Sequence, residues 1–596
     1  MHSLVPLVVA LPLLASAVLV ALGRHVPRPG PDVVAIATAA ATSVLCVLLA
    51  YAARDHDLVY WFGGWRPAHG IALGIDFDVD FASACVAALA SVVATASLVF
   101  SWHYFDEVGV LFHALVLVFL AAMTGFALSG DLFNLFVFLE LMSVVAVALT
   151  AYGDEPGPLQ GALSFAVLNG IGAFFVLTGI GLVYARTGAL NLEQVGRALE
   201  HRRPDGLVVV AFALIVCGFL TKAGIVPFHF WLSDAYAVAP APVCAIFAGV
   251  MSDLGLHAAG RVYWSGFAGA LASHEAGLRA VLVALGCASA LLGGAMAFLQ
   301  RDLKRMIAFV TVSQLGVGLV GIGLLKAVAL GGSTLVVLSG GLLRAAALLA
   351  VGLVISVTGV GDELRGRGMG RRLPLTGIVV ALAAIGLTGL PPFGTHAGRA
   401  LVESGAPGGY GWLPVVLTVA SILTSAALLR AAGRVFLGWG ASSDSILGPQ
   451  HVSAEDEEPR QRPRSPVLLV PAVVLLLLGL GLSLYPSVAD QTTSAAARVV
   501  DHRAHAAEVL AGGPLTATRV DSDTFGATSL VSGIVSAVGA VALALLTLRL
   551  RRVSDLPGLL LVRPLKALHS GVVGDYVAWL VFGVALVGAL FAFLLR

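Results

Sequence analysis

The sequence predicts an all-α polytopic membrane protein with about 16 transmembrane helices. Hydrophobic residues make up 58% of its 596 residues, charged residues make up only 12%, and the mean hydropathy is +0.95. This composition excludes a soluble globular protein. Apolar runs long enough to cross a hydrocarbon core of roughly 30 Å cover residues 3–23, 32–52, 79–101, 109–129, 131–151, 161–185, 206–236, 240–262, 278–299, 306–327, 333–358, 375–404, 412–437, 467–486, 527–549 and 573–595.

The first apolar run follows Met1, His2 and Ser3 directly, and no basic region precedes it. It also lacks a convincing small-residue cleavage site. We therefore expect a retained helix rather than a removed signal peptide.

Basic residues gather in alternate short loops, and this pattern sets the expected orientation in the cell membrane. By the positive-inside rule these loops are cytoplasmic, and counting the spans from them places both termini outside. The loop at 186–205 also carries arginines and weakly contradicts this orientation. The basic loop residues are Arg301, Lys304, Arg305, Arg365, Arg367, Arg371, Arg372, Arg549, Arg551, Arg552, Arg563 and Lys566.

Composition and motifs give no indication of a cofactor. The five cysteines lie in apolar runs without metal-ligand spacing, so we expect no disulfide and no metal or iron–sulfur site. A net charge of +1 gives no reason to expect nucleic acid as a partner. The sequence also lacks a nucleotide-phosphate loop, a dinucleotide fingerprint and a haem-attachment motif. Energy must then come from an ion gradient or from another subunit.

Two stretches between the apolar runs differ in composition. Residues 438–466 mix both charges with proline, as is typical of a linker, and we expect this linker to be cytoplasmic. It separates a core from C-terminal accessory helices at 467–596. Residues 487–526 are rich in Ala, Thr, Asp and Gly, and we assign no secondary structure to them.

Two apolar runs share a Gly-x-x-Pro-Phe element at mid-membrane: TKAGIVPFHF at 221–230 and LTGLPPFGTHAGR at 387–399. Proline removes a helix hydrogen bond, so each span should break there and free backbone groups that need polar partners. Paired broken helices are typical of ion sites in transporters. The alternative is a proline kink of no functional importance.

Lys222 is one of only four lysines, and it lies halfway through the run that contains the first break. A buried lysine can release its proton, whereas an arginine cannot, so Lys222 is a candidate titrating group on a proton path. Glu140 lies nine residues after Asp131, or roughly 14 Å along a helix, and is the expected partner of Lys222. The alternative for both residues is a static bridge that fixes helix packing.

Three further titratable residues lie near these two. His229 follows Lys222 by seven residues, on the far side of the break, and suits proton transfer, although it could simply bond the freed backbone. Asp253 and His257 are four residues apart and share a helix face, where they extend the relay or pair with each other.

The second half of the chain carries Arg344 and Arg399 within apolar runs, with His396 three residues before Arg399. Arginine keeps its proton in proteins, so neither can be a titrating carrier. We expect them to tune the potential, anchor an anion or hold water.

Four segments resemble a known family, the antiporter-like proton-conducting membrane subunits of respiratory complex I, Mrp antiporters and membrane-bound hydrogenases. The resemblance covers roughly residues 105–437. The tail at 563–586 looks more like the long, hydrogenase-4-like members. The four segments are FNLFVFLELMS (133–143), KAGIVPFHFWLSDAYAVAPAPVCA (222–245), QRDLKRMIAFVTVSQLG (300–316) and GLPPFGTHAGR (389–399).

The resemblance implies a core of about fourteen helices that contains two inverted five-helix repeats. We place these repeats at 106–262 and 278–437, after accessory helices at 1–105. It also implies partners, namely other membrane subunits of one complex and, in redox-driven members, hydrophilic redox subunits. The transported ions are protons and, in some members, Na⁺. Glu140, Lys222 and His229 carry over directly to the family's proton path.

The chain departs from the family pattern in its second half. Asp253 stands where the family usually has lysine, and Gly340 and Arg344 stand where it has a histidine and lysine pair. Arg399 stands where the family has lysine or glutamate. The first half-channel therefore looks intact, whereas the second lacks titrating residues at the expected places, apart from His396.

The leading hypothesis is an ion-translocating subunit that moves protons, or exchanges protons for a cation, and binds no redox cofactor itself. The first alternative is a structural membrane anchor with a decayed channel. The second is a stand-alone or energising transporter for another solute, such as inorganic carbon. The candidate path residues are Glu140, Lys222, His229, Asp253, His257, Lys304, Arg344, His396 and Arg399.

Overall fold

The computed structural model describes residues 2–105, 109–153, 156–200, 205–440, 466–511, 527–549, 569 and 571–594. Among these residues, 13 helices are long and apolar enough to cross a membrane, or 14 if the bent pair α19 and α20 is one span. The chain is therefore a multi-pass membrane protein. The predicted number of about 16 spans stays a prediction. Of the predicted linker at 438–466, residues 441–465 lie outside the described part.

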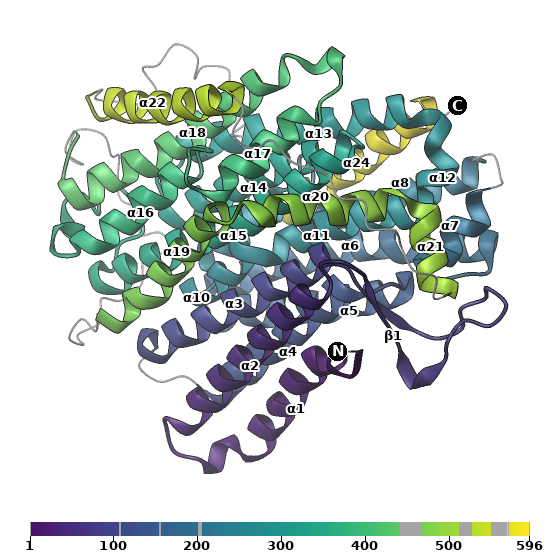
Figure 1. Ribbon diagram of the computed structural model, residues 1–596. Helices are drawn as coiled ribbons and strands as arrows, with labels where there is room; N and C mark the ends of the chain where they lie inside the picture. The colour runs from purple at the N-terminus through teal and green to yellow at the C-terminus, as the bar shows by residue number, and fades with distance from the viewer. Residues whose placement is uncertain are drawn as a thin grey trace.

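The N-terminal half packs as antiparallel helices with short connections, as Figure 1 shows. A small antiparallel hairpin of β1 and β2 connects α2 to α3, and it departs from the expected all-α fold. The elements of this half are α1 (Leu7–Leu22), α2 (Gly30–Ala52), β1 (Leu58–Trp61), β2 (Asp76–Val79), α3 (Phe81–Tyr104), α4 (Val110–Leu128), α5 (Leu132–Thr150), α6 (Pro156–Thr187), α7 (Leu192–Glu200), α8 (Gly206–Ala223), α9 (Phe230–Val238), α10 (Ala241–Ile246), α11 (Ser252–Arg261) and α12 (Ala268–Leu271).

The second half continues the same packing and ends in accessory helices. α10, α11 and α12 are joined by π-helical turns, η4 (Phe247–Met251) and η5 (Val262–Phe267). The following elements are α13 (Glu275–Leu299), α14 (Leu303–Gly323), α15 (Ala327–Thr358), α16 (Pro374–Gly386), α17 (Gly394–Ser404), α18 (Leu413–Ala432), α19 (Val470–Leu484), α20 (Pro486–Val500), α21 (His502–Ala511), α22 (Ala527–Arg549) and α24 (Val573–Leu594).

Aspartate side chains begin several of the helices that carry candidate residues. Asp131, Asp205 and Asp302 each accept a hydrogen bond from a backbone N–H in the first turn of α5, α8 and α14. Such caps satisfy donors that would otherwise lack partners at a helix start. They fix where these helices begin, and so they fix the depth of the side chains that follow.

Both predicted helix breaks are present. α8 ends at Gly224, whose φ of 70° is left-handed, and the next helix, α9, begins at Phe230. The freed backbone finds polar partners: Trp231 Nε1 donates to the Thr221 carbonyl at 2.9 Å, and the amide of Val226 donates to Ser289 Oγ at 3.0 Å. These bonds satisfy backbone polar groups that lose their helical partners when a helix breaks within the membrane.

The second break, between α16 and α17, is satisfied in the same way. Gly389 has a φ of 75°, and its carbonyl lies 2.9 Å from His396 Nδ1. Thr395 Oγ1 donates to the Gly386 carbonyl at 2.5 Å, and Gln314 Nε2 donates to the Leu387 carbonyl at 3.4 Å. His396 and Gln314 therefore hold the break in place.

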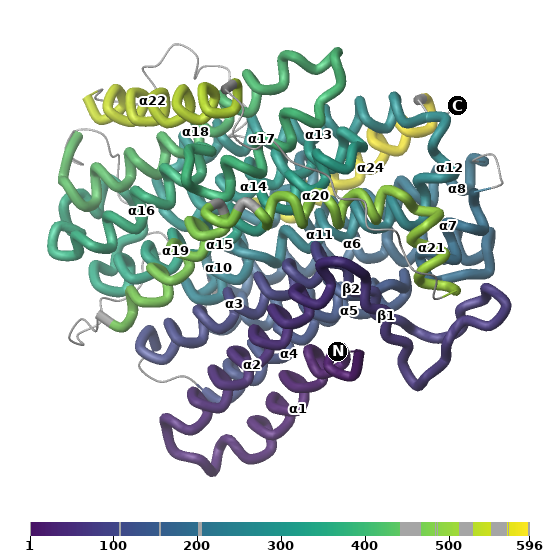
Figure 2. Tube along the Cα trace, in the orientation of Figure 1, coloured from purple at the N-terminus to yellow at the C-terminus, as the bar shows by residue number. Residues whose placement is uncertain are grey.

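The C-terminal helices wrap around the core. After α19 the chain bends by 73° into α20, which packs across α15 and α3 and delivers α21 to α7. Figure 2 shows this path, with α22 against α18 and α24 beside α8. Most of residues 487–511, to which the sequence pattern gives no assignment, form α20 and α21, because packing on the core supplies burial that the local composition does not suggest. Residues 512–526 lie outside the described part.

Candidate functional site: a buried polar path

Lys222 lies in the last turn of α8, directly before the first break, and its side chain is 2% exposed. Its ammonium donates to Ser143 Oγ at 3.1 Å and lies 5.2 Å from the centre of the Phe165 ring. An ammonium buried at this depth is costly unless charges and dipoles stabilise it. The aromatic face and the hydroxyl supply part of that stabilisation.

Glu140 lies on α5, one turn before Ser143, and like Ser143 it faces Lys222 on α8. Its charge interacts with that of Lys222, but the hydrogen bond of Lys222 goes to Ser143. Among the described residues, Glu140 Oε1 is buried without a hydrogen-bond partner. The two groups are therefore neighbours without a closed ion pair.

His229 is buried just before α9, on the far side of the break from Lys222. Its ring centre lies 5.2 Å from that of His569 and 6.5 Å from that of Phe309. His569 precedes α24, so a C-terminal accessory segment reaches the candidate path. Nothing in the sequence pattern pointed to this contact, because 340 residues separate the two histidines.

Asp253 and Arg344 form a closed, buried ion pair between α11 and α15. Arg344 Nη2 lies 2.5 Å from Asp253 Oδ2, each side chain is 1% exposed, and Arg344 Nε donates to the Ala248 carbonyl at 2.7 Å. The interpretation that Asp253 pairs with His257 is therefore wrong. His257 Nε2 lies 3.2 Å from the Ala127 carbonyl instead.

His257 also lines a cavity of about 60 Å³ together with Asp80 and Arg261. Lys304, in the first turn of α14, donates to the Ala239 carbonyl at 3.3 Å and so ties α14 to the end of α9. Lys304 is buried and His257 is partly buried, but the described contacts do not join either one to Lys222 directly.

The second half of the path centres on Arg399. Its Nε lies 2.7 Å from Glu403 Oε1, and its terminal nitrogens donate to Thr418 Oγ1 at 2.5 Å and to Ser536 Oγ at 3.0 Å. Ser536 belongs to α22, so a second accessory helix reaches the path. Glu403 was missed in the sequence, although its spacing of four residues from Arg399 on one helix face was a usable signal.

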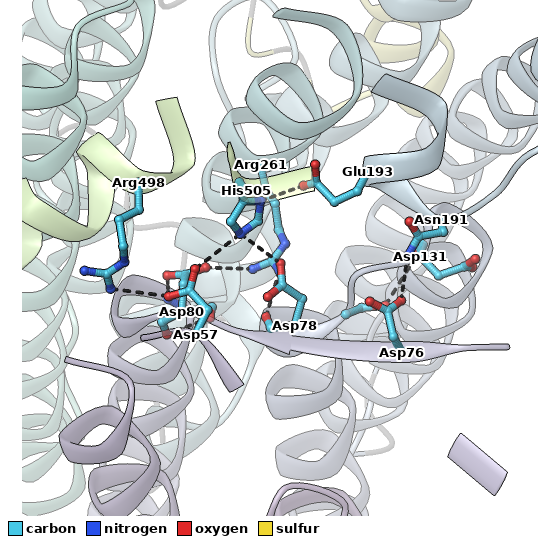
Figure 3. A network of polar contacts seen from close by, with 12 residues as sticks. Asp57, Asp76, Asp78, Asp80, Asp131, Asn191, Glu193, Arg261, Arg498 and His505 are labelled. Carbon is cyan, nitrogen blue, oxygen red and sulfur yellow. Dashed lines mark hydrogen bonds and ion pairs between the residues drawn. The ribbon is translucent and has the colours of Figure 1, made fainter. Parts of the chain in front are cut away.

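A separate, buried polar network lies where the hairpin meets α7, α11 and α21 (Figure 3). Arg261 bridges Asp78 Oδ2 at 2.6 Å and Asp80 Oδ2 at 3.0 Å. Burial, then the charges of Asp78 and Asp131, raise the pKa of Asp76 well above its ordinary value. Burial alone would also raise the pKa of Asp80, but Arg261 holds it below its ordinary value. Neighbouring carboxyl groups of one network thus have pKa values shifted in opposite directions.

Comparison with known proteins matches this chain to a family. A family model described as NADH:quinone oxidoreductase/Mrp antiporter, transmembrane, matches residues 129–424. The chain is 32% identical over 440 residues to NADH-quinone oxidoreductase subunit N of Desulforudis audaxviator, covering 73% of this chain and 85% of the relative. It is 26% identical over 426 residues to a Na(+)/H(+) antiporter subunit of Bacillus subtilis, covering 70% of this chain and 81% of that relative.

Two solved structures share the fold. A chain of the Mrp complex from Dietzia sp. DQ12-45-1b has a TM-score of 0.74 and 25% identity, over 85% of this chain and 99% of that chain. A chain of the membrane-bound sulfane sulfur reductase, an archaeal respiratory membrane complex, has a TM-score of 0.73 and 23% identity, over 86% of this chain and 100% of that chain. Both neighbours are parts of assemblies with several subunits.

Proposed function

Because the chain belongs to the NADH:quinone oxidoreductase/Mrp antiporter membrane family, we propose that it is a proton-translocating subunit of a multisubunit complex in the bacterial cell membrane. Its relatives are antiporter-like membrane subunits, so other membrane subunits are its partners. We also propose that both termini lie outside, in keeping with the basic loops.

The state of Lys222 carries this proposal. A lysine that served only to fix helix packing would close on its carboxylate, as Arg344 closes on Asp253 at 2.5 Å in the same molecule. Lys222 instead bonds a neutral hydroxyl, and Glu140 stays one turn away as a separate charge. An amine held in this way can release and regain a proton, with Glu140 stabilising its charged form.

The proposed path runs from Glu140 and Lys222 to His229, and then into the second half through His396. Glu403 is paired with Arg399, so it neutralises that guanidinium as Asp253 neutralises Arg344. Arg344 and Arg399 keep their protons and act by setting the local potential. Asp253 is held by Arg344, so its role is to neutralise that guanidinium rather than to carry a proton.

The decisive experiment compares Lys222→Ala with Lys222→Arg in the assembled complex. Proton translocation is followed in inverted membrane vesicles with a pH-sensitive dye, and co-purification of the partner subunits serves as the control for assembly. We expect both variants to lose translocation, because arginine restores the charge but cannot release a proton. Normal translocation by Lys222→Arg would make Lys222 a structural cation and refute the relay.

A second candidate function is a structural subunit with an inactive channel. The closed Asp253–Arg344 pair favours it, because a fixed pair stands where the resembling family has a titrating lysine. In that case Lys222→Ala and Glu140→Gln would both leave translocation by the complex unchanged, and their effects would be confined to assembly.

A further inference from the structure

The hairpin near the N-terminus and the late helix α21 meet in the polar network of Figure 3. Asp57 lies just before β1, Asp78 lies on β2, and His505 lies on α21, more than 400 residues later in the chain. All three side chains are buried, and His505 is 1% exposed. One nitrogen and two carboxylate oxygens from these residues lie within 4.8 Å of one another.

The atoms of this cluster are spaced as metal ligands are. His505 Nε2 lies 3.3 Å from Asp57 Oδ2 and 3.4 Å from Asp78 Oδ2. Zinc bound at about 2.0–2.1 Å in a tetrahedral site separates its ligand atoms by about 3.3–3.4 Å. Among the described residues, neither His505 Nε2 nor Asp57 Oδ2 has a partner with regular hydrogen-bond geometry, so this buried ring nitrogen lies between two carboxylates at ion-pair distance from both.

Each of the three side chains also has a second polar partner outside the cluster. His505 Nδ1 lies 2.8 Å from Glu193 Oε1, Arg498 lies 3.3 Å from Asp57 Oδ1, and Arg261 donates to Asp78. A carboxylate on the second ring nitrogen leaves Nε2 unprotonated and aimed at the ion, which is how metal-binding histidines are usually oriented. The supporting contacts therefore match a metal site as well as the ligand spacing does.

The charge of the cluster calls for a divalent cation. Four carboxylates face two guanidinium groups, so the cluster favours a further positive charge. Burial lowers the pKa of His505, but Glu193 and Asp78 raise it well above its ordinary value. A proton on the imidazole would compensate one of the two remaining negative charges, whereas a divalent ion would compensate both. A buried net charge of this size is costly, and a bound ion of charge +2 neutralises it. The carboxylates belong to Asp57, Asp78, Asp80 and Glu193, and the guanidinium groups belong to Arg261 and Arg498.

We propose that Asp57, Asp78 and His505 bind a divalent transition metal ion, best matched by zinc, that ties α21 to the N-terminal hairpin. One nitrogen and two oxygens in a tetrahedral arrangement suit zinc better than calcium or magnesium, which prefer more oxygen ligands. Glu508, partly buried and one turn after His505, has a buried Oε2 without a hydrogen-bond partner among the described residues and interacts with the charges of Asp57 and His505, so it is the candidate fourth ligand. Cysteine spacing could not indicate this site, because it contains no cysteine.

The site is a structural clamp and does not depend on the proposed proton path. Through α20 it holds the C-terminal segment across α15 and α3. It also joins this segment to α7, where Glu193 supports the histidine. Loss of the ion should therefore loosen α21 and leave the mid-membrane helices assembled.

The test measures bound metal in the full-length protein purified in detergent within its complex. After removal of metal by a chelator and dialysis against zinc, elemental analysis should find one zinc per chain, and cobalt substitution should give the visible absorption of a tetrahedral site. His505→Gln should weaken zinc binding by at least about 100-fold, and Glu193→Gln by about 10–100-fold. His502→Gln is the matched control, because it lies on the same helix but contacts Glu200 instead.

Each outcome decides the matter. Stoichiometric zinc that is lost in His505→Gln and kept in His502→Gln supports the site. Zinc bound equally by all three proteins is adventitious and overturns it. A folded wild-type complex that binds no zinc after dialysis also overturns it, and makes His505 a protonated imidazolium held by the carboxylates. If His505→Gln does not fold, the milder Glu193→Gln variant gives the same decision.

Discussion

The Asp253–Arg344 pair offers the sharpest energetic prediction. Both side chains are 1% exposed and meet at 2.5 Å, so removing one partner leaves a buried charge without compensation. Breaking a buried ion pair in this way costs about 3–5 kcal/mol. Arg344 keeps one other contact, to the Ala248 carbonyl at 2.7 Å, which cannot neutralise its charge. We therefore expect Asp253→Leu to destabilise the protein by about 3–5 kcal/mol.

The double variant distinguishes this explanation from loss of packing. Asp253→Leu combined with Arg344→Met removes both charges and keeps the volume, so we expect most of the stability to return, because such replacements are often neutral. Unfolding is followed by tryptophan fluorescence in mixed micelles that contain a rising fraction of a denaturing detergent. It gives the free energy of unfolding of the wild type, the two single variants and the double variant. Additive costs in the double variant, or a cost below about 1 kcal/mol for Asp253→Leu, would contradict the prediction of a closed, desolvated pair.

Three further predictions concern single sites. Ser143→Ala removes the hydroxyl that accepts from Lys222, a charged hydrogen bond of about 1.5–3 kcal/mol, so the translocation rate should fall about tenfold or more while Ser143→Thr stays near wild type. Glu403→Gln leaves the buried Arg399 guanidinium without its charge partner and changes the local potential, so it should slow translocation without loss of assembly, whereas Glu275→Gln, which removes an exposed partner of Arg279 at the same spacing, should not. Gly224→Ala should cost about 1–2 kcal/mol in thermal unfolding because its φ is 70° and the new Cβ would lie 2.6 Å from Leu232, whereas Gly170→Ala meets open space.

The helix breaks could be predicted from the sequence because their cause is local. Proline and glycine at 224–227 and 389–392 act on their own backbone, and both breaks lie where they were expected. The depth of Lys222 and Glu140 also follows from counting along a helix. The family itself was recognisable from four short segments within residues 133–399, and the comparisons confirm it.

The contacts made by those side chains could not be predicted, because they depend on which helices meet. Asp253 bonds Arg344, 91 residues away, rather than His257 on its own helix. Lys222 donates its hydrogen bond to Ser143, whereas the sequence predicted Glu140 as its partner. α20 and α21 form because they gain burial on the core, which a weakly apolar sequence does not reveal.

The exchange of a histidine and lysine pair for Gly340 and Arg344 is best explained as one coupled change. Gly340 precedes Arg344 by one turn, and a Cβ at Gly340 would lie 3.1 Å from Arg344 Nη1. Any side chain there would crowd the guanidinium, which needs its full reach to contact both Asp253 and the Ala248 carbonyl. Glycine at 340 therefore leaves room that a side chain would take from the guanidinium, and the acid at 253 neutralises it, so the three residues fit together physically.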